Sequence, residues 1–257
     1  MTLIAALPMY DWPEIRDETD ARWNVMREGL RKNHIEVPER LVRRNDEMPP
    51  VPGGIRDENG NLIAPDPATL PPDDLDLAVL WRHPSLFMAE TCWGPMELGL
   101  QQHVSVIGQS NYEGILGGSG EYYRSAIIAR KIGRKQVAPS VDGSAMLPMS
   151  ELFGGRLAYN ETRSLSGYLS LRSDLQAAGE TLSIFSESIE TGAHRASIKA
   201  VAEGDADFAA IDCKSLMLAQ RFDQEAREVE VIGWTAWRKG IPYIRARSVA
   251  VNAVQNI

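Results

Sequence analysis

The stretch 159–168 reads YNETRSLSGY. The apolar run 156–159 before the loop is typical of a strand, and the leucines after it recur at helical spacing. Ser164 and Ser166 are therefore candidate N-caps of a helix. A helix N-terminus presents unpaired N–H groups and about half a positive charge, which favours an anion. The stretch predicts either an ordinary capped surface helix or an anion seat.

The composition of the chain excludes several classes of protein. The 257 residues suffice for one large domain or for two lobes. A net charge of −8 and a pI near 5.1 argue against a nucleic-acid binder. They leave room for a small anionic ligand, because local donors make such a site. Cys92 and Cys213 give no disulfide framework, and the four scattered histidines form no zinc-type pair, so we expect neither a metal nor a cofactor.

Two further patterns concern membranes and targeting. No run approaches the roughly 20 apolar residues that a membrane-spanning helix needs. The apolar segment 1–7 is short, lacks a basic n-region and leads directly into Pro8, so it predicts a buried strand rather than a signal peptide. The chain is then either cytoplasmic or has lost a leader.

The N-terminal half alternates between strands and helices, which is typical of an α/β fold. A strand over 2–9 precedes a helix over 13–33, and Tyr10 and Trp12 follow the strand's carboxyl end, where ligands bind in open α/β sheets. Aromatic packing over the sheet end explains them equally well. The proline-rich segment 43–74 predicts an insertion, with a small hairpin at Asn59-Gly60.

The later strands also end in polar or aromatic groups. Trp93 follows a strand over 86–92, and Tyr123 lies in a strand over 122–130. Because neighbours in a strand point to opposite faces, Tyr122 and Tyr123 cannot share one site, which disfavours a ferric-ion site. Asp212 ends the apolar strand 208–212, where it fits both a binding site and the cap of the next helix.

Motifs along almost the whole chain resemble the substrate-binding proteins of phosphonate, phosphite and phosphate ABC importers. The more specific ones are SLSGY at 164–168 and GAHRAS at 192–197, which is followed by GDADFAAID at 204–212; weaker ones are LPMYD at 7–11, ETCWG at 90–94 and YYRSA at 122–126. The resemblance implies an α/β, two-lobed type 2 periplasmic-binding-protein fold with a ligand cleft between the lobes. Lobe 1 would comprise 1–110 with 241–257 returning to it, and lobe 2 would comprise 111–240.

The resemblance also implies roles for particular residues. Ser164, Ser166 and Gly167 would hold a phosphoryl-type anion with the helix N–H groups. Tyr123 and His194 would reach the ligand, and Asp212 would face a cationic or hydroxyl part of it. The aromatic wall of lobe 1 would consist of Tyr10, Trp12 and Trp93.

Three features depart from the family pattern: the serine loop, the missing leader peptide and the missing closing helix. Leu165 separates the two serines, and Arg163 beside them suggests an extra charge-assisted clamp that also suits a carboxylate. No closing C-terminal helix is evident.

The glycine-dotted segment 114–120, expected to be a flexible connection, and Gly240 are candidate hinge positions.

The implied function is capture of a small oxyanion for an ABC permease, in the periplasm. Ser166, His194 and Asp212 could in principle form a nucleophile set. No G-x-S-x-G elbow is present and both serines fit helix caps, so we expect no catalytic residue. The alternative is a cytoplasmic enzyme or a ligand-sensing protein on the same fold, since fold alone does not decide function.

Overall fold

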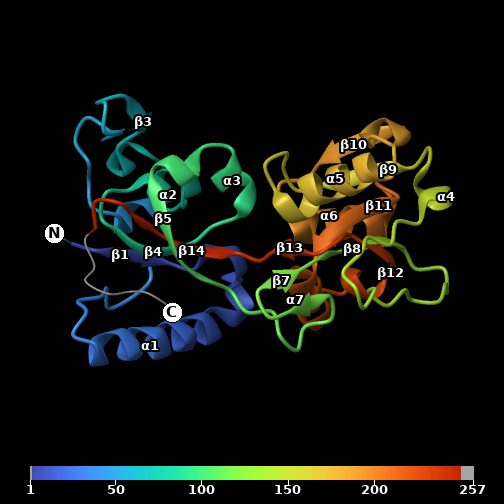
Figure 1. Ribbon diagram of the computed structural model, residues 1–257, viewed down its shortest axis with the longest axis horizontal. Coiled ribbons are helices and arrows are strands. Elements are labelled where there is room, and N and C mark those ends of the chain that lie inside the picture. Colours follow the sequence, from blue (N-terminus) through green and yellow to red (C-terminus); the bar gives the residue numbers. More distant parts are fainter. Residues whose placement is uncertain (1, 250–257) are drawn as a thin grey trace. The chain divides into compact units, whose positions relative to one another are not determined.

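The computed structural model describes residues 2–249. Contacts within the chain divide these residues into two compact units, one made of 2–110 and 241–249 and the other of 111–240. Each unit has its own α/β core (Figure 1). The expected absence of a closing C-terminal helix concerns residues after 249 and lies outside the described residues.

The first unit is built on a four-stranded sheet in the order β1 (Ile4–Ala6), β4 (Leu86–Glu90), β14 (Pro242–Ala246) and β5 (Val104–Gln109). Strand β1 is parallel to β4, whereas β14 is antiparallel to both of its neighbours. Figure 1 shows α1 (Arg16–Lys32) on one side of this sheet and α2 (Leu77–Arg82) and α3 (Trp93–Glu97) on the other. Helix α1 buries Trp23 and Leu30 in the core, as its apolar spacing requires.

The first strand is shorter than predicted. It ends at Ala6, because Pro8 begins a short 3-10 turn, Pro8–Tyr10, and a proline cannot donate to a strand ladder. A second 3-10 turn, Pro13–Ile15, then leads into α1. The predicted alternation of strand and helix is nevertheless confirmed.

The proline-rich segment packs onto the first unit. Its hairpin pairs β2 (Ile55–Arg56) with β3 (Leu62–Ala64), and Gly60 has a φ of 81°, so the predicted turn at Asn59-Gly60 is confirmed. Short 3-10 turns Asn45–Glu47 and Pro67–Thr69 flank the hairpin. Met48, Ile55 and Ala64 join the apolar core, which ties the segment to it.

The second unit is built on a five-stranded sheet. The order is β10 (Glu187–Glu190), β9 (Arg156–Tyr159), β11 (Phe208–Asp212), β8 (Ser125–Arg130) and β12 (Val229–Trp234). Strands β9, β10 and β11 are parallel, whereas β8 is antiparallel to β11 and β12. Helices α4 (Met149–Leu152), α5 (Ser170–Ala177), α6 (His194–Glu203) and α7 (Cys213–Phe222) complete the unit. The carboxyl ends of the three parallel strands therefore share one edge.

One sequence expectation for this unit needs correction. The single strand predicted over 122–130 is two strands, because β7 (Tyr122–Tyr123) turns away after Tyr123 to pair with β6 (Gly118–Ser119) and β13 (Arg238–Lys239). The flexibility expected of 114–120 stays a prediction; within this segment a Cβ on Gly118 would lie 2.5 Å from the Tyr112 carbonyl oxygen, so this glycine allows close packing. The alternation of the tyrosines is confirmed, since Tyr122 is 44% exposed and Tyr123 is buried.

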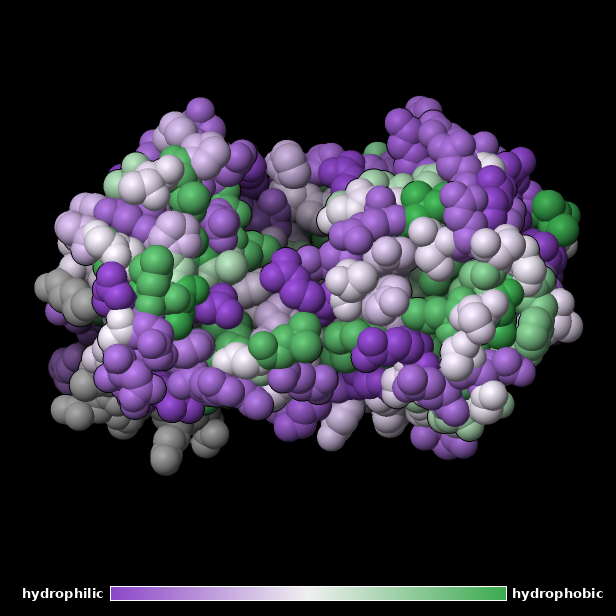
Figure 2. Space-filling view, turned by 90° about the horizontal axis from the view of Figure 1, so that it is seen from above, coloured by the Kyte–Doolittle hydropathy of each residue, from purple (hydrophilic) through white to green (hydrophobic). Residues whose placement is uncertain are grey.

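The surface matches the composition. Figure 2 shows polar residues over much of the face seen from above, with apolar residues scattered among them. Among the helices of the described residues, none has the length and apolar character needed to cross a membrane.

Candidate anion-binding site

Three loops meet at the carboxyl edge of the parallel strands in the second unit. The loop after β9 carries Asn160 and Ser164, the loop after β10 leads to His194, and Asp212 ends β11. Adjacent parallel strands deliver the residues after them to one place, which is where α/β sheets bind ligands. The topology therefore brings together residues that are 52 positions apart in the sequence.

Ser164 is the helix cap, as the sequence predicts. Its φ of −69° and ψ of 124° are those of a capping residue, and its Oγ accepts a hydrogen bond of 3.1 Å from the Gly167 N–H. Asn160 Nδ2 donates to the same Oγ at 2.9 Å. The first turn, Leu165–Leu169, is a wider π-helix that continues into α5. Both serines are buried, so their hydroxyls lie in a shielded helix start.

His194 connects the serine loop to Asp212. Its Nε2 lies 2.9 Å from Ser166 Oγ and 3.4 Å from Asp212 Oδ2. Burial lowers the pKa of His194 below its ordinary value, and the nearby Asp212 carboxylate opposes that effect in part. The ring is therefore neutral near pH 7. Its Nδ1 is buried and has no hydrogen-bond partner among the described residues.

Gly167 allows the two helix starts to approach. A Cβ at this position would lie 1.9 Å from Asn160 Oδ1 and 3.3 Å from His194 Cε1. No side chain larger than hydrogen fits there without displacing Asn160. His194 is the first residue of α6, which has no side-chain cap bond in the part of the chain that the structure describes. Two helix N-termini thus face one small region, and both favour negative charge.

Both carboxylate oxygens of Asp212 already accept hydrogen bonds from neighbouring residues of the chain. Its Oδ1 accepts from the N–H groups of Lys214 at 3.0 Å and of Ser215 at 2.9 Å, which caps α7. The Ser215 hydroxyl donates to Oδ2. Of the two interpretations that the sequence left open, the helix cap is the one that the structure displays.

The remaining predicted residues are spread more widely. Arg163 is exposed and pairs with Glu161 at 3.0 Å. Tyr123 is buried and stacks on Tyr112, with ring centroids 5.2 Å apart. The aromatic candidates of the first unit follow strand ends there, as expected: Tyr10 and Trp12 after β1, and Trp93 after β4.

Ser166, His194 and Asp212 do not form a catalytic relay. In a nucleophile triad the base uses one ring nitrogen for the nucleophile and the other for the carboxylate. Here both Ser166 and Asp212 face Nε2. The geometry therefore suits binding better than proton transfer.

Sequence reasoning missed two contributors. The sequence did not single out Asn160 as a site residue, although its position four residues before Ser164 permits the bond to the capping hydroxyl. Ser125 Oγ donates to the Ser166 carbonyl oxygen at 2.9 Å and holds the helix start against the sheet. Ser125 lies opposite Asp212 in the β8–β11 ladder, a pairing that local sequence does not reveal.

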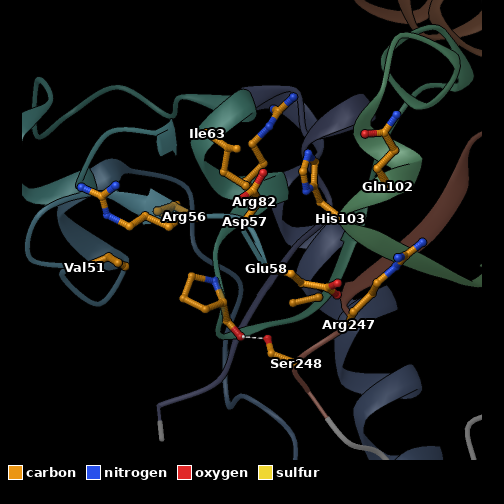
Figure 3. Close-up of a pocket in the computed structure, with 13 residues that line it drawn as sticks. Val51, Arg56, Asp57, Glu58, Ile63, Arg82, Gln102, His103, Arg247 and Ser248 are labelled. Carbon is orange, nitrogen blue, oxygen red and sulfur yellow. Dashed lines mark hydrogen bonds between the residues drawn. The ribbon is translucent and has the colours of Figure 1, made fainter. Parts of the chain in front are cut away.

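A separate pocket of about 340 Å³ lies in the first unit. Figure 3 shows Arg56 and Arg247 extending to opposite sides of it rather than toward a common point. Their guanidinium groups donate to backbone carbonyls, Arg56 to Gly60 and Arg247 to Gln101. The Asp57 carboxylate stabilises its own turn by accepting from Asn59 and Asn61. Arg56 and Arg247 therefore do not form a shared anion clamp in this pocket.

Comparison with known proteins agrees with the motifs. Residues 96–253, more than half of the chain, match the family model described as ABC transporter, phosphonate, periplasmic substrate-binding protein. No curated protein sequence matches the chain.

Solved structures show the same type of fold. PhnD1 from Prochlorococcus marinus (MIT 9301), in complex with methylphosphonate, is 16% identical, with a TM-score of 0.59 over 95% of this chain and 75% of that one. A binding protein component of an ABC phosphonate transporter from Pseudomonas aeruginosa is also 16% identical, with a TM-score of 0.47 over 66% of this chain and 54% of that one. The first of these matches confirms the predicted α/β periplasmic-binding-protein fold.

Proposed function

This chain belongs to the family of periplasmic substrate-binding proteins of phosphonate ABC transporters, and we propose that it captures a small phosphonate-type oxyanion at the serine loop. The observation that carries this proposal is the pair of buried hydroxyls, Ser164 and Ser166, at a helix start beside the start of α6, for which the described residues provide no side-chain cap. Hydroxyl hydrogens and helix N–H groups are donors, which is what a phosphonate oxygen requires. The family consists of solute-binding proteins, in agreement with the expected lack of catalysis.

Hydrogen bonds and the helix N-terminus can supply the free energy that a micromolar affinity requires. A hydrogen bond to a charged group contributes roughly 1.5–3 kcal/mol, and a helix N-terminus adds roughly 0.3–1 kcal/mol. Four such contacts near the top of that range total about 12 kcal/mol, and after an association cost of about 4 kcal/mol they leave the free energy of about −8 kcal/mol that corresponds to a micromolar Kd. Because the hydroxyls are already fixed by Asn160 and His194, little side-chain ordering opposes binding.

The rest of the proposal concerns location and partner. In this account the protein works in the periplasm and delivers its ligand to an ABC permease. The family description supports both points. The assignment of Tyr10, Trp12, Trp93 and Tyr123 as further ligand contacts stays a prediction.

Calorimetric titration tests the proposal directly. Methylphosphonate, phosphate, sulfate and acetate are titrated into the protein, and we expect a micromolar Kd for at least methylphosphonate or phosphate. Ser166→Ala should weaken that affinity about tenfold, or about 1.4 kcal/mol. Ser186→Ala is the matched control, because the Ser186 hydroxyl donates to the Gly155 carbonyl at the opposite end of the sheet. The proposal fails if no anion of the panel binds, or if Ser166→Ala binds as tightly as the parent.

A further inference from the structure

The hydrogen bonds around Ser164 fix the direction of its hydroxyl group. A serine hydroxyl offers two lone pairs and one hydrogen. Ser164 Oγ accepts from the Gly167 N–H at 3.1 Å and from Asn160 Nδ2 at 2.9 Å. Both lone pairs are then filled, so the hydrogen is left to donate. The Ser166 hydroxyl, 3.5 Å away, is only a long-range acceptor for it.

A similar argument fixes the Ser166 hydroxyl through the tautomer of His194. Nε2 faces the Asp212 carboxylate at 3.4 Å, and an ionised carboxylate only accepts. With the proton on Nε2, the ring donates toward Asp212 and toward Ser166 Oγ at 2.9 Å. With the proton on Nδ1, a lone pair would face the carboxylate and a buried N–H would lack a partner among the described residues. The proton therefore belongs on Nε2, and Ser166 keeps its own hydrogen for another acceptor.

We propose that Asn160 and Asp212 are positioning residues that turn the Ser164 and Ser166 hydroxyl hydrogens toward the bound oxyanion. The inference rests on the proposed function and deepens it. The ligand class is an oxyanion whose oxygens accept from both serines at once. Asp212 acts through His194 and does not itself contact the ligand, because its two oxygens receive Lys214, Ser215 and the His194 ring. This assignment differs from the ligand contact that the family resemblance implies.

Asp212→Asn tests the His194 half of the inference. The amide oxygen can keep the cap of α7, while the new NH₂ group donates to His194 Nε2 and moves the ring proton to Nδ1. Long-range ¹H–¹⁵N spectra of the ligand-free parent should show His194 protonated on Nε2, and those of the variant should show the proton on Nδ1. The affinity for methylphosphonate should fall about tenfold, because Ser166 then competes for the same Nε2 lone pair.

Asn160→Asp tests the Ser164 half. The carboxylate accepts from the Ser164 hydroxyl and reverses its direction, so methylphosphonate affinity should fall more than tenfold. Thr162→Asp is the matched control, since it adds the same charge to an exposed position in the same loop; we expect a loss below threefold. Thermal melts of each variant verify folding.

The outcomes separate the two levels of the argument. A parent protein with His194 protonated on Nδ1 overturns the inference, and so does an Asp212→Asn variant with unchanged tautomer and affinity. If Asn160→Asp and Thr162→Asp lose equal affinity for methylphosphonate, the added negative charge alone explains the effect, and the positioning role of Asn160 is overturned. If the parent binds no anion, the proposed function fails, whereas the tautomer measured without ligand still decides the role of Asp212.

Discussion

Replacing Gly167 with alanine should disrupt the serine loop, because the new methyl group has no room. The Cβ would lie 1.9 Å from Asn160 Oδ1, about 1.5 Å short of ordinary van der Waals contact at 3.4 Å. Asn160 has to swing away and gives up its 2.9 Å bond to Ser164. Overpacking of this kind costs about 1–3 kcal/mol and the lost bond about 0.5–1.5 kcal/mol, against a gain of about 1 kcal/mol from the better helix propensity of alanine.

We therefore expect Gly167→Ala to destabilise the second unit by about 1–3 kcal/mol, which corresponds to a Tm lower by about 2–4 °C per kcal/mol. Thermal unfolding followed by circular dichroism measures the shift. Gly29→Ala is the control, because Gly29 lies inside α1 and nothing beyond the adjacent helix backbone comes within 4 Å of the added methyl group; this change should raise stability by up to about 1 kcal/mol. A Gly167→Ala variant that melts at or above the parent temperature would refute the close packing described for this loop.

Three further predictions concern titration, thiol reactivity and capping. Burial lowers the pKa of His194 from its ordinary 6.5, so the neutral ring's contribution to the free energy of unfolding is complete above pH 6.5 and is lost as the pH falls through the lowered pKa. Thermal melts between pH 5 and 8 should show this loss of stability, and the loss should be smaller in His194→Gln. Burial raises the pKa of Cys213 to about 12, so native protein at pH 8 should be alkylated at Cys92 well before Cys213, and equal labelling would contradict that assignment. Asp212→Ala removes the cap of α7 and should lower the free energy of unfolding, measured by chemical denaturation, by about 0.5–2 kcal/mol. Asp205→Ala at the surface is the control, and a loss for Asp212→Ala below about 0.3 kcal/mol, similar to that of the control, would show that the cap is unimportant.

Local chemistry made part of the site predictable from sequence. The strand 156–159 and the cap at Ser164 depend on residues within a few positions of one another, and both are present in the structure. The α/β fold was predictable for a related reason, since strand and helix periodicities are local signals.

Contacts between distant segments could not be read in the same way. The bond from Ser125 to the Ser166 carbonyl depends on the register between β8 and β11. The sequence also left two roles open for Asp212, because a carboxylate at a strand end suits a cap and a site equally well. The break between Tyr123 and Ser125 arises because β7 pairs with β6 and β13, which is a tertiary choice.

The π-helical turn at Leu165–Leu169 was also outside the reach of sequence reasoning. Helical periodicity across Leu165, Tyr168 and Leu169 predicted an ordinary α-helix. The wider turn instead places Leu165 and both serines in buried positions. Such turns occur often at functional sites, which agrees with the location of the proposed anion seat.

Chemical-shift mapping with methylphosphonate tests the central claim most directly. Titration of ¹⁵N-labelled protein should shift the backbone amides of 164–169 and 194–197 most strongly, because these two helix starts would hold the oxyanion. Ser166→Ala should weaken those shifts at equal ligand concentration. Shifts confined instead to the pocket around Ile55 and Arg247, with the two helix starts unmoved, would contradict the account.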